Sequence, residues 1–421
     1  MSAPTTSTTS SHVSAPPADV LVVGAGLAAA QTVAALRAHG YDGVVRVLGA
    51  EDVPPYDRPP LSKHLLDRTE PAWLTDELGL DLHGLADEVR LGVAARALEV
   101  RPGRAGAVVR TDDGEVDASC VVLATGAHAV RVPAWPTALT LHTAADAERL
   151  RTALDHGPRR LVVVGAGWIG AEVAGVAAAA GHHVTVVEAR DAPLVTGLGA
   201  TVGALTVPWY AAAGVDLRLG ATVTTVGPDG VRLADEAHLP ADVVLVAVGA
   251  RPATGWLAGA VPLVDGAVAV DEAYRVLGAD GPLDGLLAVG DVARRRSARY
   301  GWVPGGHWDE ALRGPDLLVR RLLGADDDGG ELTPYVFSTQ LGHDLAMFGL
   351  PGAGDVPTVL GDPEDGGWSV LWTRGTDGPV TAALAVDRPR DVGAARRLLA
   401  GPDLPRVPLD GATSLAALPR R

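Results

Sequence analysis

Short aliphatic runs, each followed by a glycine turn, predict a parallel α/β fold. Residues 20–23 are four consecutive aliphatic side chains, typical of a buried parallel strand. Gly24, Gly26 and Ala29 follow with the spacing G-x-G-x-x-G/A, and an alanine-rich helix is expected to run to Gly40. Gly24 permits a tight turn, Gly26 lets a phosphate approach the backbone, and the helix N-terminus attracts negative charge. This stretch is therefore predicted to bind a dinucleotide pyrophosphate.

The same pattern returns near the middle of the chain. Residues 161–164 form a second aliphatic run, and Gly165, Gly167 and Gly170 complete a second glycine fingerprint before another alanine-rich helix. Glu188 ends the following strand, close to the position about 20 residues on where an acid binds the adenosine ribose. Two such units, both in a strand–turn–helix context, predict that two dinucleotides bind at once.

Charged residues after the second strand of each unit are expected to bind the adenosine ends of the two dinucleotides. Glu51 follows the strand predicted at Val44–Leu48 and is the candidate for the first ribose. An acid at Glu188 favours NAD, because it would repel the 2′-phosphate of NADP. Arg190 lies two residues further on and could accept that phosphate, so NADPH stays open as a second donor.

Three further segments are expected to line the nucleotide sites. The loop at 54–66, PPYDRPPLSKHLL, is predicted to be rigid and non-helical until Ser62 caps a short helix from Lys63. Aliphatic runs at 121–124 and 243–246 lead into turns that contain Gly126 and Gly249. A further run ends at Asp291, whose carboxylate can accept hydrogen bonds from a polyol.

These elements predict an α/β protein with two Rossmann-like dinucleotide-binding domains and a C-terminal α+β domain. The expected divisions are a disordered tail at 1–19, a split first domain at 20–144 and 266–330, a second domain at 145–265, and a C-terminal domain at 331–421. Within the last, β-like runs are expected at 335–337, 370–372 and 380–386, with a helix at 390–399.

Composition limits the partners and the chemistry. The chain carries 51 acidic and 35 basic residues, a net charge of −16, which argues against nucleic acid as the main partner. Cys120 is the single cysteine, so an intrachain disulfide, a C-x-x-C pair and a cysteine-rich metal site are excluded, and we expect no metal centre. The first 19 residues lack the basic start and apolar core of a signal peptide, and no run suits a membrane span. We expect a cytoplasmic protein that acts away from membranes.

Taken together, these features resemble the FAD-dependent pyridine nucleotide oxidoreductases. Within them, the chain is most similar to the NAD-dependent ferredoxin reductases that serve cytochrome P450 and aromatic-ring dioxygenase systems. The resemblance covers about residues 20–415 and rests on the doubled fingerprint, YDRPPLSK at 56–63, ATGA at 124–127, GDVA at 290–293 and RRLL at 396–399. The lack of a C-x-x-C pair separates the chain from disulfide reductases.

The resemblance implies the residues of each site. Tightly but non-covalently bound FAD would contact Gly24, Gly26, Leu27, Ala28, Ala29, Glu51, Arg58, Lys63, Thr125, Gly126, Asp291 and Trp308. NADH, the hydride donor, would contact Gly165, Gly167, Trp168, Ile169, Gly170, Glu188 and Gly249. Lys63 and Glu172 are the catalytic candidates, expected to pair beside the flavin ring and the nicotinamide.

The chain departs from the family pattern near the expected flavin. His142 stands where the family usually has an arginine that contacts FAD. Pro304 and Gly306 stand where the family has arginine and glutamate, before a helix expected to break early at Pro315. FAD binding is still expected.

The predicted activity is electron transfer from NADH through FAD to an acidic ferredoxin, which in turn serves a cytochrome P450 or a ring-hydroxylating oxygenase. In the C-terminal domain, Phe337 replaces the family's flavin-facing tryptophan and Thr339 replaces an aspartate, which leaves the acceptor open. Two alternatives therefore remain: an NADH-dependent reductase of a small acceptor such as a quinone, and a non-catalytic redox-sensing flavoprotein. Both a monomer and a homodimer are compatible with the sequence.

A ferredoxin is usually acidic, so its docking to a protein of net charge −16 requires a local basic patch. The resemblance places the run after GDVA close to the flavin. The residues expected to form the patch are Arg294, Arg295, Arg296 and Arg299. The extension expected for it consists of Arg313, Arg320 and Arg321.

Overall fold

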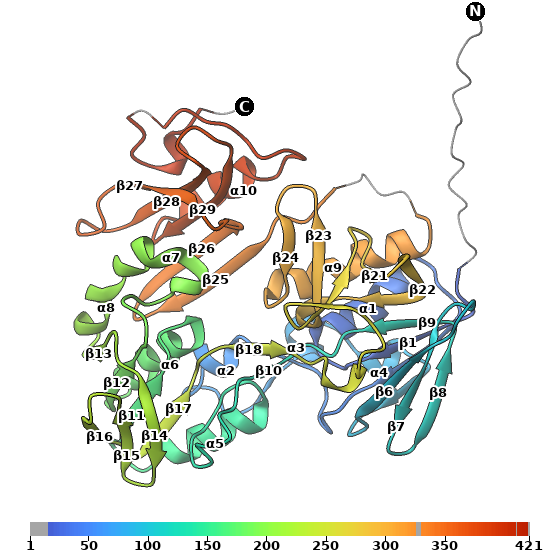
Figure 1. Ribbon diagram of the computed structural model, residues 1–421, viewed down its shortest axis with the longest axis horizontal. Helices are drawn as coiled ribbons and strands as arrows, with labels where there is room; N and C mark the ends of the chain where they lie inside the picture. The colour runs from blue at the N-terminus through green and yellow to red at the C-terminus, as the bar shows by residue number, and fades with distance from the viewer. Residues whose placement is uncertain (1–15, 326–329, 410, 420–421) are drawn as a thin grey trace, which may run out of the picture.

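The computed structural model describes residues 16–325, 330–409 and 411–419 of the chain. Two nucleotide-binding sheets and a C-terminal sheet form separate layers, with the C-terminal sheet lying over the second nucleotide domain (Figure 1). Of the tail expected at 1–19, residues 1–15 lie outside the described part of the chain. Its last residue, Asp19, is an ordered part of the first strand, where its carboxylate binds Ser119 and Arg46.

The first sheet is organised around β1 (Asp19–Val23), which pairs in parallel with β2 (Val44–Leu48) and β9 (Cys120–Leu123). Its order is β24-β23-β20-β21-β22-β9-β1-β2-β5, and β19 pairs with β20. The other strands are β5 (Glu88–Arg90), β19 (Leu263–Val264), β20 (Ala267–Val270), β21 (Arg275–Gly278), β22 (Gly281–Ala288), β23 (Ala293–Ser297) and β24 (Gly301–Pro304).

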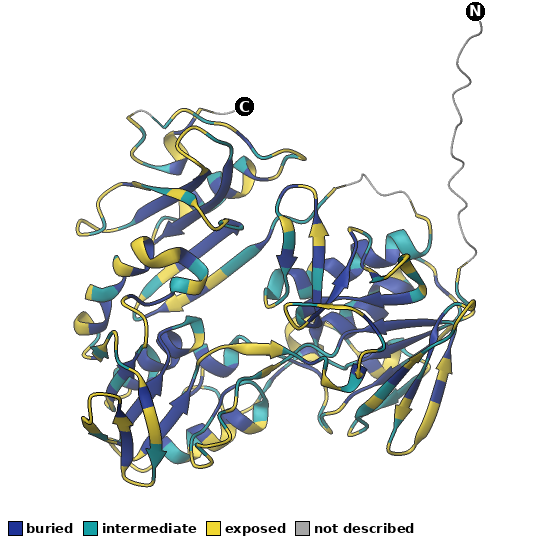
Figure 2. Cartoon of the chain, in the orientation of Figure 1, coloured by how far each residue is buried: buried dark blue, intermediate teal, exposed yellow. Residues whose placement is uncertain are grey.

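The first core takes in more than this sheet. An antiparallel sheet of β6 (Ala95–Val100), β7 (Ala107–Thr111) and β8 (Gly114–Ala118) packs into it, together with the helix α1 (Leu27–Ala38). The short helices α3 (Leu74–Leu78) and α4 (Leu82–Leu85) also pack into this core. The segment before them, with β3 (Tyr56–Asp57), α2 (Pro60–Lys63) and β4 (Ala72–Trp73), packs instead against the core of the second nucleotide domain. The dark strands and helix in Figure 2 show that β1, β9 and α1 form the most buried part of this domain.

The second sheet repeats this arrangement with the order β13-β12-β11-β17. Its parallel strands are β11 (Arg160–Val164), β12 (His183–Val187), β13 (Asp216–Arg218) and β17 (Val243–Val246), flanked by the helices α5 (Ala144–Leu154), α6 (Trp168–Ala179), α7 (Val195–Ala204) and α8 (Val207–Ala212). A small antiparallel sheet of β14 (Val223–Gly227), β15 (Gly230–Leu233) and β16 (His238–Pro240) is attached to it. The predicted α/β class with two Rossmann-like units is confirmed.

The C-terminal domain is an antiparallel sheet in the order β25-β26-β29-β28-β27. Its strands are β25 (Tyr335–Gln340), β26 (His343–Gly349), β27 (Asp355–Leu360), β28 (Trp368–Arg374) and β29 (Val380–Val386), and α10 (Pro389–Leu398) follows. Every residue of β29 is buried, because α10 packs on one side of the sheet and residues of α7 and α8 contribute to the core on the other. The predicted run at 380–386 matches β29, whereas those at 335–337 and 370–372 are shorter than β25 and β28, and β26 and β27 were not predicted.

The chain returns to the first domain earlier than expected. Leu257 and Val261 already lie in the core of the first sheet, so the boundary expected between 265 and 266 is too late. The two crossings between the nucleotide domains run side by side as an antiparallel pair, β10 (Ala127–Ala129) and β18 (Ala250–Pro252) (Figure 1). Among the described helices, none has both the length and the apolar character needed to cross a membrane.

The predicted break at Pro315 is wrong, because α9 (Trp308–Leu322) continues through it. A proline inside a helix costs roughly 3 kcal/mol. Beyond it, Leu317, Leu318 and Val319 are buried in the core that also contains α1, and burying one such side chain contributes roughly 1.5–3 kcal/mol. Packing of this amphipathic face therefore outweighs the local cost of the proline.

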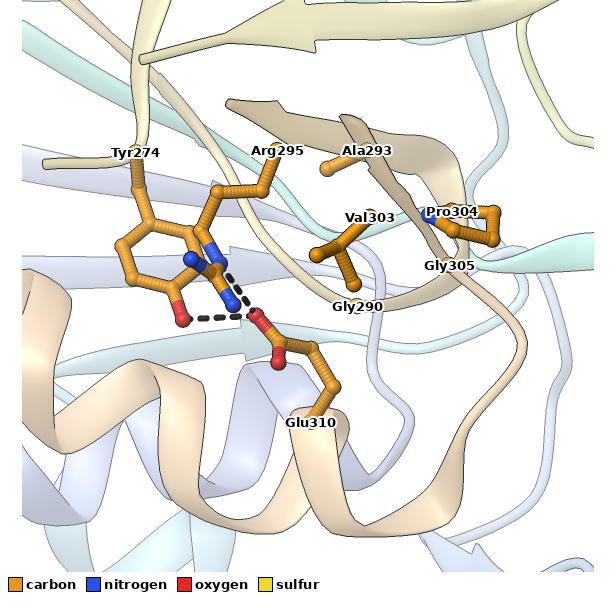
Figure 3. A pocket seen from close by; sticks show the side chains of 8 residues that line it. All are labelled: Tyr274, Gly290, Ala293, Arg295, Val303, Pro304, Gly305 and Glu310. Carbon is orange, nitrogen blue, oxygen red and sulfur yellow. Dashed lines mark hydrogen bonds and ion pairs between the residues drawn. The ribbon is translucent and has the colours of Figure 1, made fainter. Parts of the chain in front are cut away.

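Two of the four arginines expected on a docking surface are buried instead. The side chains of Arg295 and Arg299 are each 3% exposed. Arg295 Nε donates to Glu310 Oε1 over 3.0 Å, and the Tyr274 hydroxyl donates to the same oxygen over 2.6 Å. Figure 3 shows these side chains converging beside a cavity of about 10 Å³, too small to hold more than about one water molecule. A buried charge is stable only when it has partners of this kind. These two arginines therefore do not belong to an exposed basic patch.

Arg299 ties the first domain to the C-terminal domain. Its Nε lies 3.3 Å from Glu331 Oε2, and its Nη2 donates to the Glu331 carbonyl over 2.8 Å. Its Nη1 donates to the carbonyls of Leu399 and Gly401, at the end of α10, over 2.9 and 3.0 Å.

The other two arginines of that group differ in exposure. Arg294 is half-buried and pairs with Asp265. Arg296 is exposed, with its guanidinium 5.7 Å from the centre of the Trp302 ring. Of the four residues expected to form the patch, Arg296 alone is exposed.

Replacing Arg299 by alanine should lower the free energy of unfolding by about 3 kcal/mol, because a buried carboxylate loses one of its partners. Urea unfolding followed by tryptophan fluorescence measures the change. Arg96→Ala is the matched control, since it removes an exposed pair with Asp112 and should leave stability unchanged within error. Equal stabilities for the two variants would contradict a stabilising role for the buried arginine.

Candidate functional site

The first glycine turn requires glycine for steric reasons. Gly24 has a φ of 118°, and a Cβ atom built on it would lie 2.1 Å from the Ala124 carbonyl oxygen at the end of β9. Its amide donates to the Leu48 carbonyl over 2.7 Å, at the end of β2. The turn therefore sits where three parallel strands end, the edge at which such sheets bind their ligands.

The start of α1 is open to an anion. Gly26 is its N-cap, and among the described residues it receives no side-chain cap and has no acid in its first turn. A Cβ atom on Gly26 would meet no described atom within 4 Å. Leu27, Ala28 and Ala29 form the buried first turn of the helix. Free amides at a helix N-terminus with space in front of them suit a pyrophosphate.

The second turn, at the start of α6, has the same geometry. Gly165 has a φ of 106°, and a Cβ on Gly170 would lie 2.1 Å from the Gly165 carbonyl, so this glycine lets helix and strand pack closely. Glu188 is held beside the turn, because its carboxylate accepts the amides of Ala166 and Arg190 over 2.8 and 2.9 Å. This is the place expected for a ribose-binding acid.

The residues around the second turn differ in exposure. Ile169 is exposed, whereas Trp168 is half-buried and lies against Gly197. Gly249 follows β17 with a φ of 112° and has open space where a Cβ would be.

The proline-rich loop forms a polar cluster. Arg58 Nη2 donates to Glu51 Oε1 over 2.8 Å, and the Tyr56 hydroxyl donates to Glu51 Oε2 over 2.6 Å. Arg58 Nη1 donates to the His142 carbonyl over 2.5 Å. One oxygen of Glu51 thus accepts from Arg58 and the other from Tyr56, and the expected ribose contact of Glu51 stays a prediction.

His142 does not replace the charge of the family's arginine. Burial and the nearby Arg58 guanidinium lower the pKa of His142 to about 4, so its ring is neutral at pH 7. The cation in this part of the site is Arg58.

The remaining residues expected near FAD are each fixed by contacts. The Asp291 carboxylate accepts the Gly306 amide over 3.0 Å, and Trp308 Nε1 donates to Asp57 Oδ1 over 2.7 Å. Thr125 Oγ1 donates to the Ala253 carbonyl over 3.0 Å. Gly126 has a φ of 69° and open space in front of it.

A buried carboxylate joins α2, α6 and β25. Glu172 on α6, 6% exposed, forms the predicted ion pair with Lys63, and the Ser338 hydroxyl of β25 donates to the same oxygen, Oε1. The Ser62 hydroxyl donates to Oε2 over 2.5 Å. Ser62 therefore lies inside α2, which begins at Pro60, and does not cap the helix as expected.

A row of aromatic rings runs from Lys63 to Arg396 of α10. Lys63 Nζ lies 5.2 Å from the centre of the Phe337 ring, and Trp308 meets that ring edge-on at 5.8 Å. Tyr335 is stacked near Phe337 at 6.1 Å and on Phe348 at 4.5 Å. We call Trp308, Phe337, Tyr335 and Phe348 the aromatic row.

Comparison with known proteins identifies the family. The model of the pyridine nucleotide-disulphide oxidoreductase family matches residues 18–309, and a model described as reductase C-terminal matches residues 335–416. This chain belongs to the pyridine nucleotide-disulphide oxidoreductases. Enzymes of this family use FAD and a pyridine nucleotide.

Relatives match almost the full length of this oxidoreductase. The ferredoxin–NAD(+) reductase component of an anthranilate 1,2-dioxygenase system from Burkholderia cepacia is 37% identical over 91% of this chain and 95% of its own. A crystal structure of a protein named Fdr9 is 38% identical, covers 95% of this chain and 98% of its own, and has a TM-score of 0.84. The covalent complex of putidaredoxin reductase with putidaredoxin gives a TM-score of 0.78 at 28% identity, over 92% of this chain and 94% of its own.

This oxidoreductase has no reactive thiol among its described residues. Burial raises the pKa of the Cys120 thiol to about 12, so the group stays protonated in the centre of the first sheet. The disulphide chemistry in the family description is therefore not available to this chain.

The motifs in the sequence mark neither Ser62 nor Ser338 as a partner of Glu172. One signal was available for Ser338. Ser338 and Gln340 are two residues apart in β25, so they share one face of the strand, and both are buried. Two buried polar residues on one face of a strand indicate a polar partner on the neighbouring element.

Gly26→Ala should abolish FAD binding and leave the thermal unfolding midpoint equal to that of the FAD-free wild-type protein. The added methyl group meets no described atom of the protein, but it occupies the space through which the pyrophosphate approaches. The visible flavin absorbance of the purified protein, together with its thermal unfolding midpoint, checks both parts.

Gly255→Ala is the matched control, because Gly255 has equally open surroundings and lies on the surface. A yellow Gly26→Ala protein would show that the first turn is not the FAD site.

Proposed function

We propose that this oxidoreductase passes electrons from NADH through FAD to a ferredoxin that serves an oxygenase. The observation that carries the proposal is the arrangement of charged and aromatic side chains around Lys63. Lys63 of α2 and Glu172 of α6 form a largely buried ion pair, and the aromatic row leads from Lys63 to the exposed Arg396. The relatives support the acceptor, since one is named as the reductase component of a dioxygenase system and another is solved with its putidaredoxin.

Bound FAD supplies the redox chemistry, since a flavin accepts an electron pair and releases electrons singly. The chain's own residues bind and orient the nucleotides. The helix starts at Gly26 and Gly167 bind the two pyrophosphates through backbone amides. Lys63, held by Glu172, places a positive charge beside the expected flavin ring, where it favours the reduced form.

The position of Glu188 indicates which pyridine nucleotide is the hydride donor. Its carboxylate is fixed beside the second turn by two backbone amides, where it binds ribose hydroxyls and repels a 2′-phosphate. We therefore propose NADH as the donor, and the cytoplasm, which holds the NADH pool, as the place of action.

The docking surface is proposed at Arg396, beside the end of the aromatic row that lies under α10. Arg396 is exposed on α10, with its guanidinium 5.6 Å from the centre of the Phe348 ring and 6.0 Å from that of Tyr335. An acidic iron–sulfur protein bound there would lie beside the aromatic row that leads to Lys63. Arg295 and Arg299, buried in ion pairs, have no part in this surface.

The first test is an anaerobic titration of the yellow protein with NADH and, separately, with NADPH. NADH should bleach the flavin at least tenfold faster than NADPH, because the Glu188 carboxylate disfavours the 2′-phosphate. Cytochrome c reduction should then require an added ferredoxin.

The acceptor assay separates the competing functions. Bleaching by NADH without ferredoxin-dependent turnover would indicate a small acceptor such as a quinone. Absence of bleaching in a protein that retains FAD would indicate a non-catalytic flavoprotein.

Arg396→Glu should raise the KM for ferredoxin about tenfold at low salt and leave NADH bleaching unchanged, since it reverses one charge at the proposed docking surface. Steady-state assays at two salt concentrations measure the effect, which should shrink as salt rises. Arg232→Glu, the same change at an exposed position of β15 in the second domain, is the matched control. An equal KM for both variants would place the docking surface elsewhere.

A further inference from the structure

We propose that Ser338 is a positioning residue, through which the C-terminal domain sets the place of Lys63 beside the flavin. The inference rests on the proposed function, because Lys63 acts on bound FAD there. It gives the C-terminal domain a part in flavin chemistry besides partner docking.

The hydrogen bonds around Glu172 have a defined direction. Gln340 Nε2 donates to Ser338 Oγ over 3.2 Å. A serine hydroxyl has one proton, and Ser338 uses it to donate to Glu172 Oε1. The chain of donors therefore runs from Gln340 through Ser338 to the carboxylate, which Lys63 approaches as the cation.

Because these side chains are buried, a lost hydrogen bond in this row of donors is hard to replace. Ser338 is 3% and Gln340 is 1% exposed, so water cannot replace a lost donor without opening the strand. A hydrogen bond to a charged group in such surroundings contributes about 1.5–3 kcal/mol. Without it, the carboxylate of Glu172 keeps Lys63 and Ser62 as donors and is free to shift toward them.

The strand that presents Ser338 is held at its other end as well. Just before β25, the Thr333 hydroxyl donates to the Leu399 carbonyl over 2.8 Å, and Arg299 Nη2 lies 3.2 Å from Thr333 Oγ1. Strand β25 thus spans from the first domain to α6 of the second, fixed by buried polar contacts near both ends. Ser338 therefore lies on a fixed strand of the C-terminal domain and not on a loop.

The experiment compares Ser338→Ala with Ser369→Ala in the FAD-loaded protein. Ser369 is a matched control, because it is buried in the same sheet and its hydroxyl donates to a carboxylate, Asp391, over 2.7 Å. Two readouts are taken: the midpoint potential of the bound flavin by equilibration with reference dyes, and the rate of anaerobic bleaching by NADH.

Ser338→Ala should make the midpoint potential more negative and slow bleaching about tenfold, the change that corresponds to ~1.4 kcal/mol. Ser369→Ala should leave both unchanged. Equal potentials in the two variants would overturn the proposal. The potential is measured without NADH or ferredoxin, so a wild-type flavin that NADH does not bleach would refute the proposed function while the comparison of variants still stands.

Gln340→Met is the second variant, and it decides the question if Ser338→Ala does not fold. It keeps the length of the side chain and removes the donor to Ser338, which frees the serine hydroxyl to rotate. The potential should shift in the same direction by a smaller amount. A potential equal to that of the wild type would overturn the directed chain of donors.

Discussion

A single buried carboxylate holds three segments of this enzyme in register. Glu172 lies on α6 of the second nucleotide domain, Lys63 and Ser62 lie on α2, which packs into the core of that domain, and Ser338 lies on β25 of the C-terminal sheet. A charge this far from water is stable only when its acceptor positions are filled. The relative positions of α2, α6 and β25 therefore depend on the hydrogen bonds of one side chain. The geometry expected beside the flavin thus depends on the C-terminal sheet as well as on the nucleotide domains.

The two nucleotide turns show how little side-chain chemistry is needed to bind a dinucleotide. Gly24 and Gly165 leave room for a neighbouring strand, and Gly26 leaves room for the ligand. The attraction comes from backbone amides at the helix starts. We propose that side chains such as Arg58 and Glu188 add orientation and selectivity, since each is held in place by other parts of the protein.

The parts of the structure that depend on local pattern were predictable from the sequence. Both glycine turns fix their own geometry, and the Lys63–Glu172 pair followed from the family resemblance. Arg295 could not be placed in this way, because consecutive arginines look like a surface. In β23 the side chains alternate, so Arg295 points inward with Ala293 and Ser297, toward a glutamate on a later helix. The continuity of α9 through Pro315 likewise depends on distant packing that local propensity does not reveal.

The buried contact of Arg299 has a mechanical consequence. The nucleotide domains are joined by the paired crossings β10 and β18, and the second domain is joined to the C-terminal sheet by a shared core. Arg299 supplies the third connection, from the C-terminal sheet back to the first domain. Three bodies connected pairwise form a triangulated frame, in which no one body can swing without breaking a connection. In such a frame we expect nucleotide exchange to proceed through movements of side chains and loops rather than of whole domains.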